Sequence, residues 1–195
     1  TTGGTLIRPG GRACYPAFWI RDYAMSLESG FIAPGEQRHA LLLTAQCQQD
    51  KPWRLRSGSF VPPGAIPDHI TLGGKPIFFP GTLDDFEGQG GAAWGYLPAF
   101  DDHFYFIQMA AAYIAITGDT DILTREIAGI PLIERLELAF YVPPSRADNG
   151  LVHCEADNRG VTFGFVDTIT YTGDVLFASL LKYHAAIEMA RFYER

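Results

Sequence analysis

The stretch DDHFYFIQMAAAYIAITG, residues 101–118, decides the fold class of this chain. Its first two residues, Asp101 and Asp102, suit a helix N-terminus, where unpaired backbone N–H groups attract negative charge. Apolar side chains then recur at helical spacing from Phe104 onwards until Gly118, a residue type that commonly ends a helix. The sequence therefore predicts one long helix here, with a well-formed start.

Four other segments have the same helical period, and short turns connect the segments into pairs. They cover roughly residues 20–28, 34–49, 122–141 and 173–195, with Pro52 and Pro143-Pro144 as stop signals. The long stretches between the pairs could all emerge at one end of such an assembly. We therefore predict a mainly α fold, part of an α/α toroid built of antiparallel helix hairpins.

Residues 51–100 do not share the helical period. They are rich in Gly and Pro, contain β-type fragments at 59–61 and 75–79, and include Leu72-Gly73-Gly74-Lys75, which is typical of a two-glycine hairpin turn. A run of about 50 residues without helices is unusual in a compact domain and favours a functional loop region. We interpret it as a long loop insertion with a β-hairpin, within a single partial domain of residues 1–195.

Length and charge limit the classes of partner. The 195 residues correspond to one domain or to part of a larger one. Lys and Arg total 15 against 22 Asp and Glu, which gives a formal net charge of −7 and a surface that repels phosphate backbones and anionic membranes. No apolar run approaches the roughly 20 residues that span a bilayer. We therefore expect neither nucleic acid nor a membrane as partner.

The three cysteines, Cys14, Cys47 and Cys154, are an odd number without the spacing of a metal site or a disulfide framework. We interpret them as reduced structural thiols. Together with the absence of a signal-peptide pattern near the start of the sequence, they slightly favour the cytoplasm. The first residue is Thr1, so the native termini and the compartment stay open.

The segment Trp19-Ile20-Arg21-Asp22-Tyr23 carries residue types that suit a polyol. An arginine beside an aspartate at a helix start presents donors and an acceptor toward the same space, and the flanking aromatic rings match the apolar face of a pyranose. The structural alternative is a helix-capping Asp22 beside a solvated Arg21.

The stretch Phe18–Ala24 resembles the tryptophan-x-arginine-aspartate segment of the six-hairpin (α/α)6-barrel glycoside hydrolases, which include glucoamylases, trehalases and the α-glucosidase I group. Residues 104–119 and 164–168 fit the same pattern, so the resemblance covers most of the chain at low identity. It implies that Arg21 and Asp22 contact the sugar at the cleaved residue, and that an α-linked glycoside is hydrolysed with inversion.

Glycoside hydrolysis needs two carboxyl groups, one protonated and one ionised. Asp167 follows aromatic and glycine residues in a loop, where desolvation would raise its pKa, and the resemblance implies a general acid at about this point. An Asx-turn or helix cap with Thr168 and Thr170 is the structural alternative. Glu155 is the rival candidate for the acid.

Several other side chains are candidates for sugar contact. Trp94 ends a glycine-rich stretch, acidic and imidazole groups follow just beyond it, and His153 belongs to a crowded His-Cys-Glu-Ala-Asp run whose spacing is not that of a zinc site. We expect no metal and no cofactor. The full set of substrate-binding candidates is Trp19, Arg21, Asp22, Trp94, Asp102, His103 and His153.

The second catalytic carboxylate is not identified in the sequence. Five helices are expected where a complete toroid has twelve, so the chain resembles the N-terminal half of a catalytic domain and the general base is expected outside it. Two alternatives stay open. One is a non-catalytic carbohydrate-binding α/α module, and the other is an α/α-toroid lyase or epimerase with a base such as His153 or Tyr171.

Overall fold

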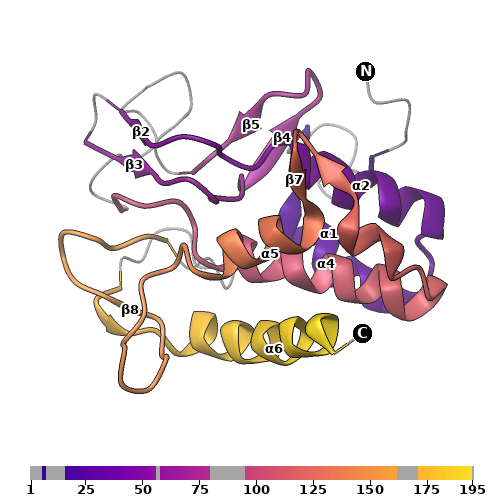
Figure 1. Cartoon of the computed structure of the whole chain (residues 1–195). Coiled ribbons are helices and arrows are strands. Elements are labelled where there is room, and N and C mark those ends of the chain that lie inside the picture. Colours follow the sequence, from indigo (N-terminus) through magenta and orange to yellow (C-terminus); the bar gives the residue numbers. More distant parts are fainter. Residues whose placement is uncertain (1–5, 8–15, 56–57, 80–94, 162–170, 195) are drawn as a thin grey trace.

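The structure, a computed structural model, describes residues 6–7, 16–55, 58–79, 95–161 and 171–194, and Figure 1 traces the chain. In chain order the elements are β1 (Ala17–Trp19), α1 (Ile20–Ser26), the 3-10 helix η1 (Leu27–Ser29), α2 (Pro34–Gln46), β2 (Trp53–Arg54), β3 (Phe60–Val61), β4 (His69–Thr71), β5 (Pro76–Ile77), α4 (Asp101–Thr117), the 3-10 helix η3 (Asp121–Thr124), β6 (Glu126–Ile127), β7 (Ile130–Pro131), α5 (Leu132–Phe140), β8 (His153–Cys154), β9 (Gly173–Asp174) and α6 (Leu176–Tyr193). A helix-rich fold is confirmed, and it also carries small antiparallel sheets.

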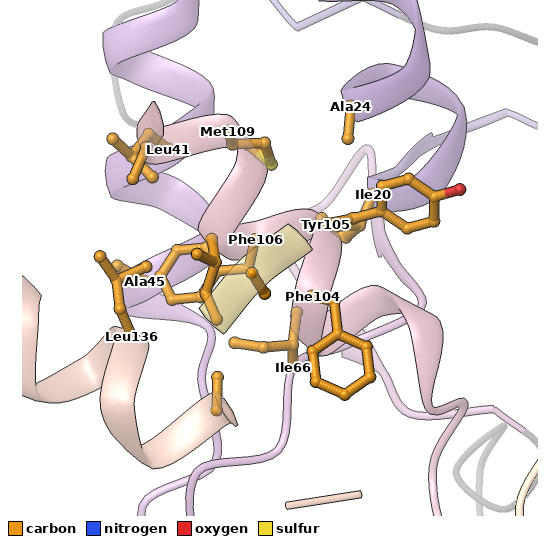
Figure 2. Close-up of a cluster of buried hydrophobic side chains, with 14 of the residues drawn as sticks. Ile20, Ala24, Leu41, Ala45, Ile66, Phe104, Tyr105, Phe106, Met109 and Leu136 are labelled. Carbon is orange, nitrogen blue, oxygen red and sulfur yellow. The ribbon is translucent and has the colours of Figure 1, made fainter. Parts of the chain in front are cut away.

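Helix α4 lies at the centre of the fold and packs against α1, α2, α5 and α6 (Figure 1). Its sequence explains this position, because apolar residues surround nearly the whole helix instead of forming one stripe. Phe104, Phe106 and Met109 are buried, and Figure 2 shows them among side chains from α1, α2 and α5. The start of α4 is thereby held firmly inside the protein.

Four of the five predicted helical segments are confirmed. Helix α4 ends at Gly118, whose φ of 69° lies in the left-handed region that glycine adopts without strain. Helix α2 begins at Pro34, where the missing N–H would have had no helical partner. Helix α1 continues into η1, and α6 starts at Leu176 after the short strand β9.

The predicted helix over residues 122–141 is wrong in its first half. Only α5 is α-helical, and it follows η3 and a hairpin of β6 and β7. Ala128 and Gly129 form the turn with φ values of 50° and 80°, the combination that a tight two-residue hairpin requires. The buried Arg135 holds this hairpin, since its Nε and Nη2 donate to the Ile127 carbonyl at 2.9 and 2.6 Å.

A three-stranded sheet of β1, β4 and β5 fixes the start of α1. The predicted hairpin at residues 72–75 is confirmed, because β4 and β5 pair on either side of it. Strand β1 adds to β4 with Trp19 opposite His69. The backbone N–H of Ile20, the first residue of α1, donates to the Asp68 carbonyl at 3.1 Å. The insertion is thus joined directly to the first helix.

The predicted loop insertion, residues 51–100, contains secondary structure and contributes to the core. Its described part holds β2 to β5, and β2 pairs with β3. Ile66 and Ile70 are buried in the main hydrophobic cluster with residues of α1, α2 and α4. The insertion therefore packs as part of the same structural unit as the helices that flank it.

Cys47 and Cys154 are free thiols, the first half-buried and the second buried, and Cys14 lies outside the described residues. No helix within the described ranges is long and apolar enough to cross a lipid bilayer.

Candidate functional site

An abrupt change from strand to helix brings several predicted site residues together. Strand β1 ends at Trp19 and α1 begins at the next residue, so Arg21 and Asp22 lie in the first helical turn. Helix α1 packs on α4, whose first turn carries Asp101 and Asp102. The structure therefore unites one guanidinium, three carboxyl groups and an indole from two segments distant in sequence.

The guanidinium of Arg21 is buried among carboxylates of separate segments. Its Nη1 lies 3.7 Å from Asp68 Oδ1 and 3.8 Å from Asp101 Oδ2, and its Nη2 lies 3.8 Å from Asp22 Oδ2. The Arg21 side chain is 7% exposed, Asp68 and Asp101 are buried, and Asp22 is 31% exposed. The solvated Arg21 of the structural alternative is therefore wrong. We call Asp22, Asp68, Asp101 and Asp102 the acidic cluster.

The acidic cluster keeps Arg21 charged. Burial by itself lowers the pKa of the guanidinium, but the charges of Asp102, Asp101 and Asp68 outweigh burial and leave the pKa above its ordinary value. One positive charge thus faces four acidic side chains, and the surplus negative charge favours protons and developing positive charge in this region.

The carboxyl group of Asp102 has a raised pKa within the acidic cluster. Burial raises its pKa well above the ordinary value, the charges of Asp101 and Asp68 raise it further, and Arg21 offsets only part of this. Neither of its carboxyl oxygens has a hydrogen-bond partner among the described residues. Burial also raises the pKa of Tyr105 to about 12, with the nearby acids contributing. A carboxyl group with a raised pKa, such as that of Asp102, can serve as a proton donor.

Two residues of this site, Asp68 and His69, were not among the sequence-based candidates. Asp68 Oδ2 lies 2.6 Å from His69 Nδ1, and both side chains are almost fully buried. The imidazole also stacks on Trp19, with ring centroids 4.1 Å apart and an interplanar angle of 29°. The available signal was an acid and a histidine directly before the apolar Ile70, at the start of the predicted hairpin.

His103 lies in the protein interior. Its Nε2 accepts a hydrogen bond from the backbone N–H of Ile66 at 3.3 Å, which ties α4 to the insertion. Burial lowers its pKa to about 4, although backbone hydrogen bonds at Phe100 and Ala99 offset part of this effect. The imidazole is therefore neutral at neutral pH, and its observed contact is with backbone.

His153 and Glu155 belong to a second, exposed group of charges. His153 Nδ1 lies 2.7 Å from Asp174 Oδ1, and His153 Nε2 lies 2.8 Å from Glu155 Oε1. Arg146 Nε donates to the same Asp174 oxygen at 2.6 Å. We call these four residues the surface network. Glu155 is 70% exposed, so it lacks the shielding that Asp102 has.

Hydrogen bonds with Glu155 and Asp174 raise the pKa of His153, and Arg146 offsets part of this. Both ring nitrogens face carboxylate oxygens, which only accept hydrogen bonds, so the arrangement requires an imidazolium. The hydrogen bonds from Arg146 and His153 in turn lower the pKa of Asp174. The surface network thus binds β8, β9 and the preceding loop through charge.

Trp94 and Asp167 lie outside the described residues, but the residues next to those stretches are well placed. The N–H of Phe100, directly before α4, donates to the Val161 carbonyl at 2.9 Å, and the N–H of Ala99 donates to the Phe79 carbonyl at 3.2 Å. The segments meet closely at Gly160, because a Cβ there would lie 2.5 Å from Phe100 Cε1. Residues 79 and 161 therefore both lie beside the start of α4.

Within the described ranges, no three His, Cys, Asp or Glu side chains are arranged as ligands of a metal ion. Comparison with models of known protein families and with curated proteins finds no match.

Proposed function

We propose that this chain forms part of a glycoside hydrolase that acts on an α-linked glycoside by an inverting, two-carboxylate mechanism. The observation that carries the proposal is the buried Arg21 within the acidic cluster, together with the indole of Trp19, which stacks on His69 next to Asp68 of that cluster. In the proposed enzyme the helix hairpins are part of an (α/α)6 toroid, and the site lies at the rim where α1 and α4 begin.

The charge of the site suits the chemistry of glycosidic bond cleavage. The transition state resembles an oxocarbenium ion, which carries positive charge on the sugar ring. Four acidic side chains against one guanidinium leave a surplus of negative charge even where Asp102 holds its proton, and fixed negative charge stabilises such a transition state. A lyase removes a proton from carbon and develops negative charge, so the same cluster would disfavour it.

The proposal gives roles to the individual side chains. Asp22 is the most exposed acid of the cluster and accepts hydrogen bonds from sugar hydroxyls, while Trp19 covers an apolar sugar face. Arg21 lies against Asp22 and holds its carboxylate in place. Asp167 is the proposed general acid, six residues after Val161, whose carbonyl accepts the hydrogen bond from the start of α4. The proposed general base comes from outside residues 1–195.

The test is hydrolysis by the full-length protein that contains this chain. We expect release of free sugar from one of the 4-nitrophenyl α-glycosides of glucose, mannose and galactose, with the β-anomer as the first product in an NMR time course. On an α-linked disaccharide of the sugar that is cleaved, whose leaving oxygen needs a proton, Asp167→Asn should reduce turnover by about two to four orders of magnitude, while the 4-nitrophenyl glycoside, whose leaving group departs without one, should lose much less. Asp157→Asn, a change of an exposed carboxylate earlier in the same loop, is the matched control and should leave turnover unchanged.

Other outcomes identify the alternatives. If the wild-type protein does not hydrolyse the glycosides and the Asp167→Asn variant still binds sugar, the chain is part of a carbohydrate-binding module. An unsaturated or epimerised product indicates a lyase or an epimerase with a base such as His153 or Tyr171. Either result contradicts the proposed hydrolase.

A further inference from the structure

His69 occupies a position with a defined orientation at the edge of the acidic cluster. It lies opposite Trp19 in the pairing of β1 and β4, and its ring stacks on the indole at 4.1 Å. Its Nδ1 lies 2.6 Å from Asp68 Oδ2. The ring is therefore held both through one face and through one nitrogen, which leaves it little freedom to rotate.

The carboxylate of Asp68 connects His69 to Arg21. One oxygen contacts His69 Nδ1 at 2.6 Å, and the other lies 3.7 Å from Arg21 Nη1. The Asp68 side chain is almost completely buried, so both contacts are shielded from water. The orientation of the imidazole and that of the guanidinium thus depend on the same buried group.

The contact with Asp68 also determines which ring nitrogen carries the hydrogen. A carboxylate only accepts hydrogen bonds, so Nδ1 of His69 is the donor, and whenever the ring carries a single hydrogen its lone pair lies at Nε2. No residue in the described part of the chain forms a hydrogen bond with Nε2. The side chain is 10% exposed. A fixed, buried aromatic acceptor with a small opening to solvent is suited to a ligand hydroxyl.

We propose that His69 is a substrate-binding residue whose Nε2 accepts a hydrogen bond from a hydroxyl of the sugar held by Asp22 and Trp19. Asp68 is a positioning residue that acts through His69 and Arg21. The inference rests on the proposed function for its ligand class, and it adds a specific contact that selects for one hydroxyl group.

Comparison of a substrate with its deoxy analogues provides the kinetic test. For the 4-nitrophenyl α-glycoside that the full-length protein cleaves, each monodeoxy analogue is measured with wild type and with His69→Phe, which keeps the stacking on Trp19 but removes both nitrogens. We expect wild type to lose about tenfold in kcat/KM on the analogue that lacks the contacted hydroxyl. For His69→Phe, kcat/KM should be no lower on that analogue than on the parent glycoside. Removal of each of the other hydroxyls should lower kcat/KM by the same factor in the variant as in wild type.

A purely structural role of His69 would instead lower kcat/KM by the same factor for every analogue, and this result would overturn the inference. His184→Phe makes the same chemical change at an exposed position on α6 and should leave all ratios as in wild type. Asp68→Asn permits the other tautomer and should weaken discrimination at the same hydroxyl as His69→Phe does.

The nitrogen chemical shifts of His69 give a readout that does not depend on hydrolysis or on a folded variant. In wild-type protein labelled with 15N-histidine, Nδ1 should be protonated and Nε2 unprotonated, and Nε2 should shift on saturation with methyl α-glucoside, methyl α-mannoside or methyl α-galactoside. A protonated Nε2 without sugar, or no shift with any of the three, overturns the inference. Hydrolysis without a His69 shift leaves the proposed function standing and removes only His69 from it.

Discussion

The acidic cluster around Arg21 and the surface network around His153 both combine aspartate and arginine side chains, but the pKa of an aspartate shifts in opposite directions in the two groups. In the surface network every charge has a partner at hydrogen-bond distance, and the pKa of Asp174 falls while that of His153 rises. In the cluster the ion pairs of Arg21 with Asp22, Asp68 and Asp101 are 3.7–3.8 Å long, and the pKa of Asp102 rises. Burial and a surplus of acid, more than residue type, set the direction of these pKa shifts.

The largest expected effect comes from removing the central cation of the acidic cluster. Arg21→Met leaves buried carboxylates without their positive partner and should lower the free energy of unfolding by about 3–5 kcal/mol. Urea unfolding followed by circular dichroism measures this. Arg146→Met is the matched change in the surface network and should have a much smaller effect, because its charges are solvated. Equal effects would contradict the comparison.

Asp102→Asn should make the protein more stable relative to wild type as the pH rises. Replacement of a surface acid with a lowered pKa should have the opposite pH dependence. A carboxyl with a raised pKa binds more protons in the folded state than in the unfolded state, so its contribution to stability is lost as pH rises from about 4 through the folded-state pKa. The amide removes this loss. The stability of Asp102→Asn relative to wild type should therefore increase with pH, and thermal unfolding at a series of pH values measures it. A difference that is constant over pH would contradict a raised pKa.

The smallest effect on the free energy of unfolding is expected when a residue of the surface network is replaced. Because the pKa of His153 is raised, its contribution is fully present below about pH 6.5 and is lost as pH rises through the folded-state pKa. The pKa of Asp174 is lowered, so its contribution is present above about pH 4 and is lost as pH falls through the folded-state pKa. The network should stabilise the protein most between these limits.

His153→Asn should accordingly destabilise the protein slightly at pH 5.5 and have less effect at pH 8.5. Hydrogen exchange of the β8 and β9 amides measures this locally. Similar exchange for the variant and wild type at both pH values would show that the network contributes nothing to local stability.

Local pattern predicted most of the helices and the hairpin at residues 72–75, because capping acids, helical period and paired glycines act within a few residues. It failed at residues 122–141, where helical period hid the two-residue turn at Ala128 and Gly129. A glycine followed shortly by Pro131 was the neglected signal. Helix period alone therefore does not exclude a short hairpin inside an apolar segment.

The site was predictable only in part, since its assembly depends on contacts distant in sequence. The residue types at Trp19, Arg21 and Asp22 indicated a polyol site. The pairing of β1 with β4 that adds Asp68 and His69 is a long-range contact with no local signature. The burial of Arg21 likewise comes from packing against α4, and the same dipeptide on a free helix would be solvated.

The most direct test of the central claim is the hydrolysis of 4-nitrophenyl α-glycosides by the full-length protein carrying Arg21→Lys. Lysine keeps the positive charge inside the acidic cluster but lacks the planar fork of donors that holds the surrounding carboxylates in fixed positions. We predict a folded protein with wild-type-like unfolding and a kcat/KM about 100-fold below wild type. Undiminished hydrolysis in a folded Arg21→Lys protein, or no hydrolysis by wild type, would contradict the account.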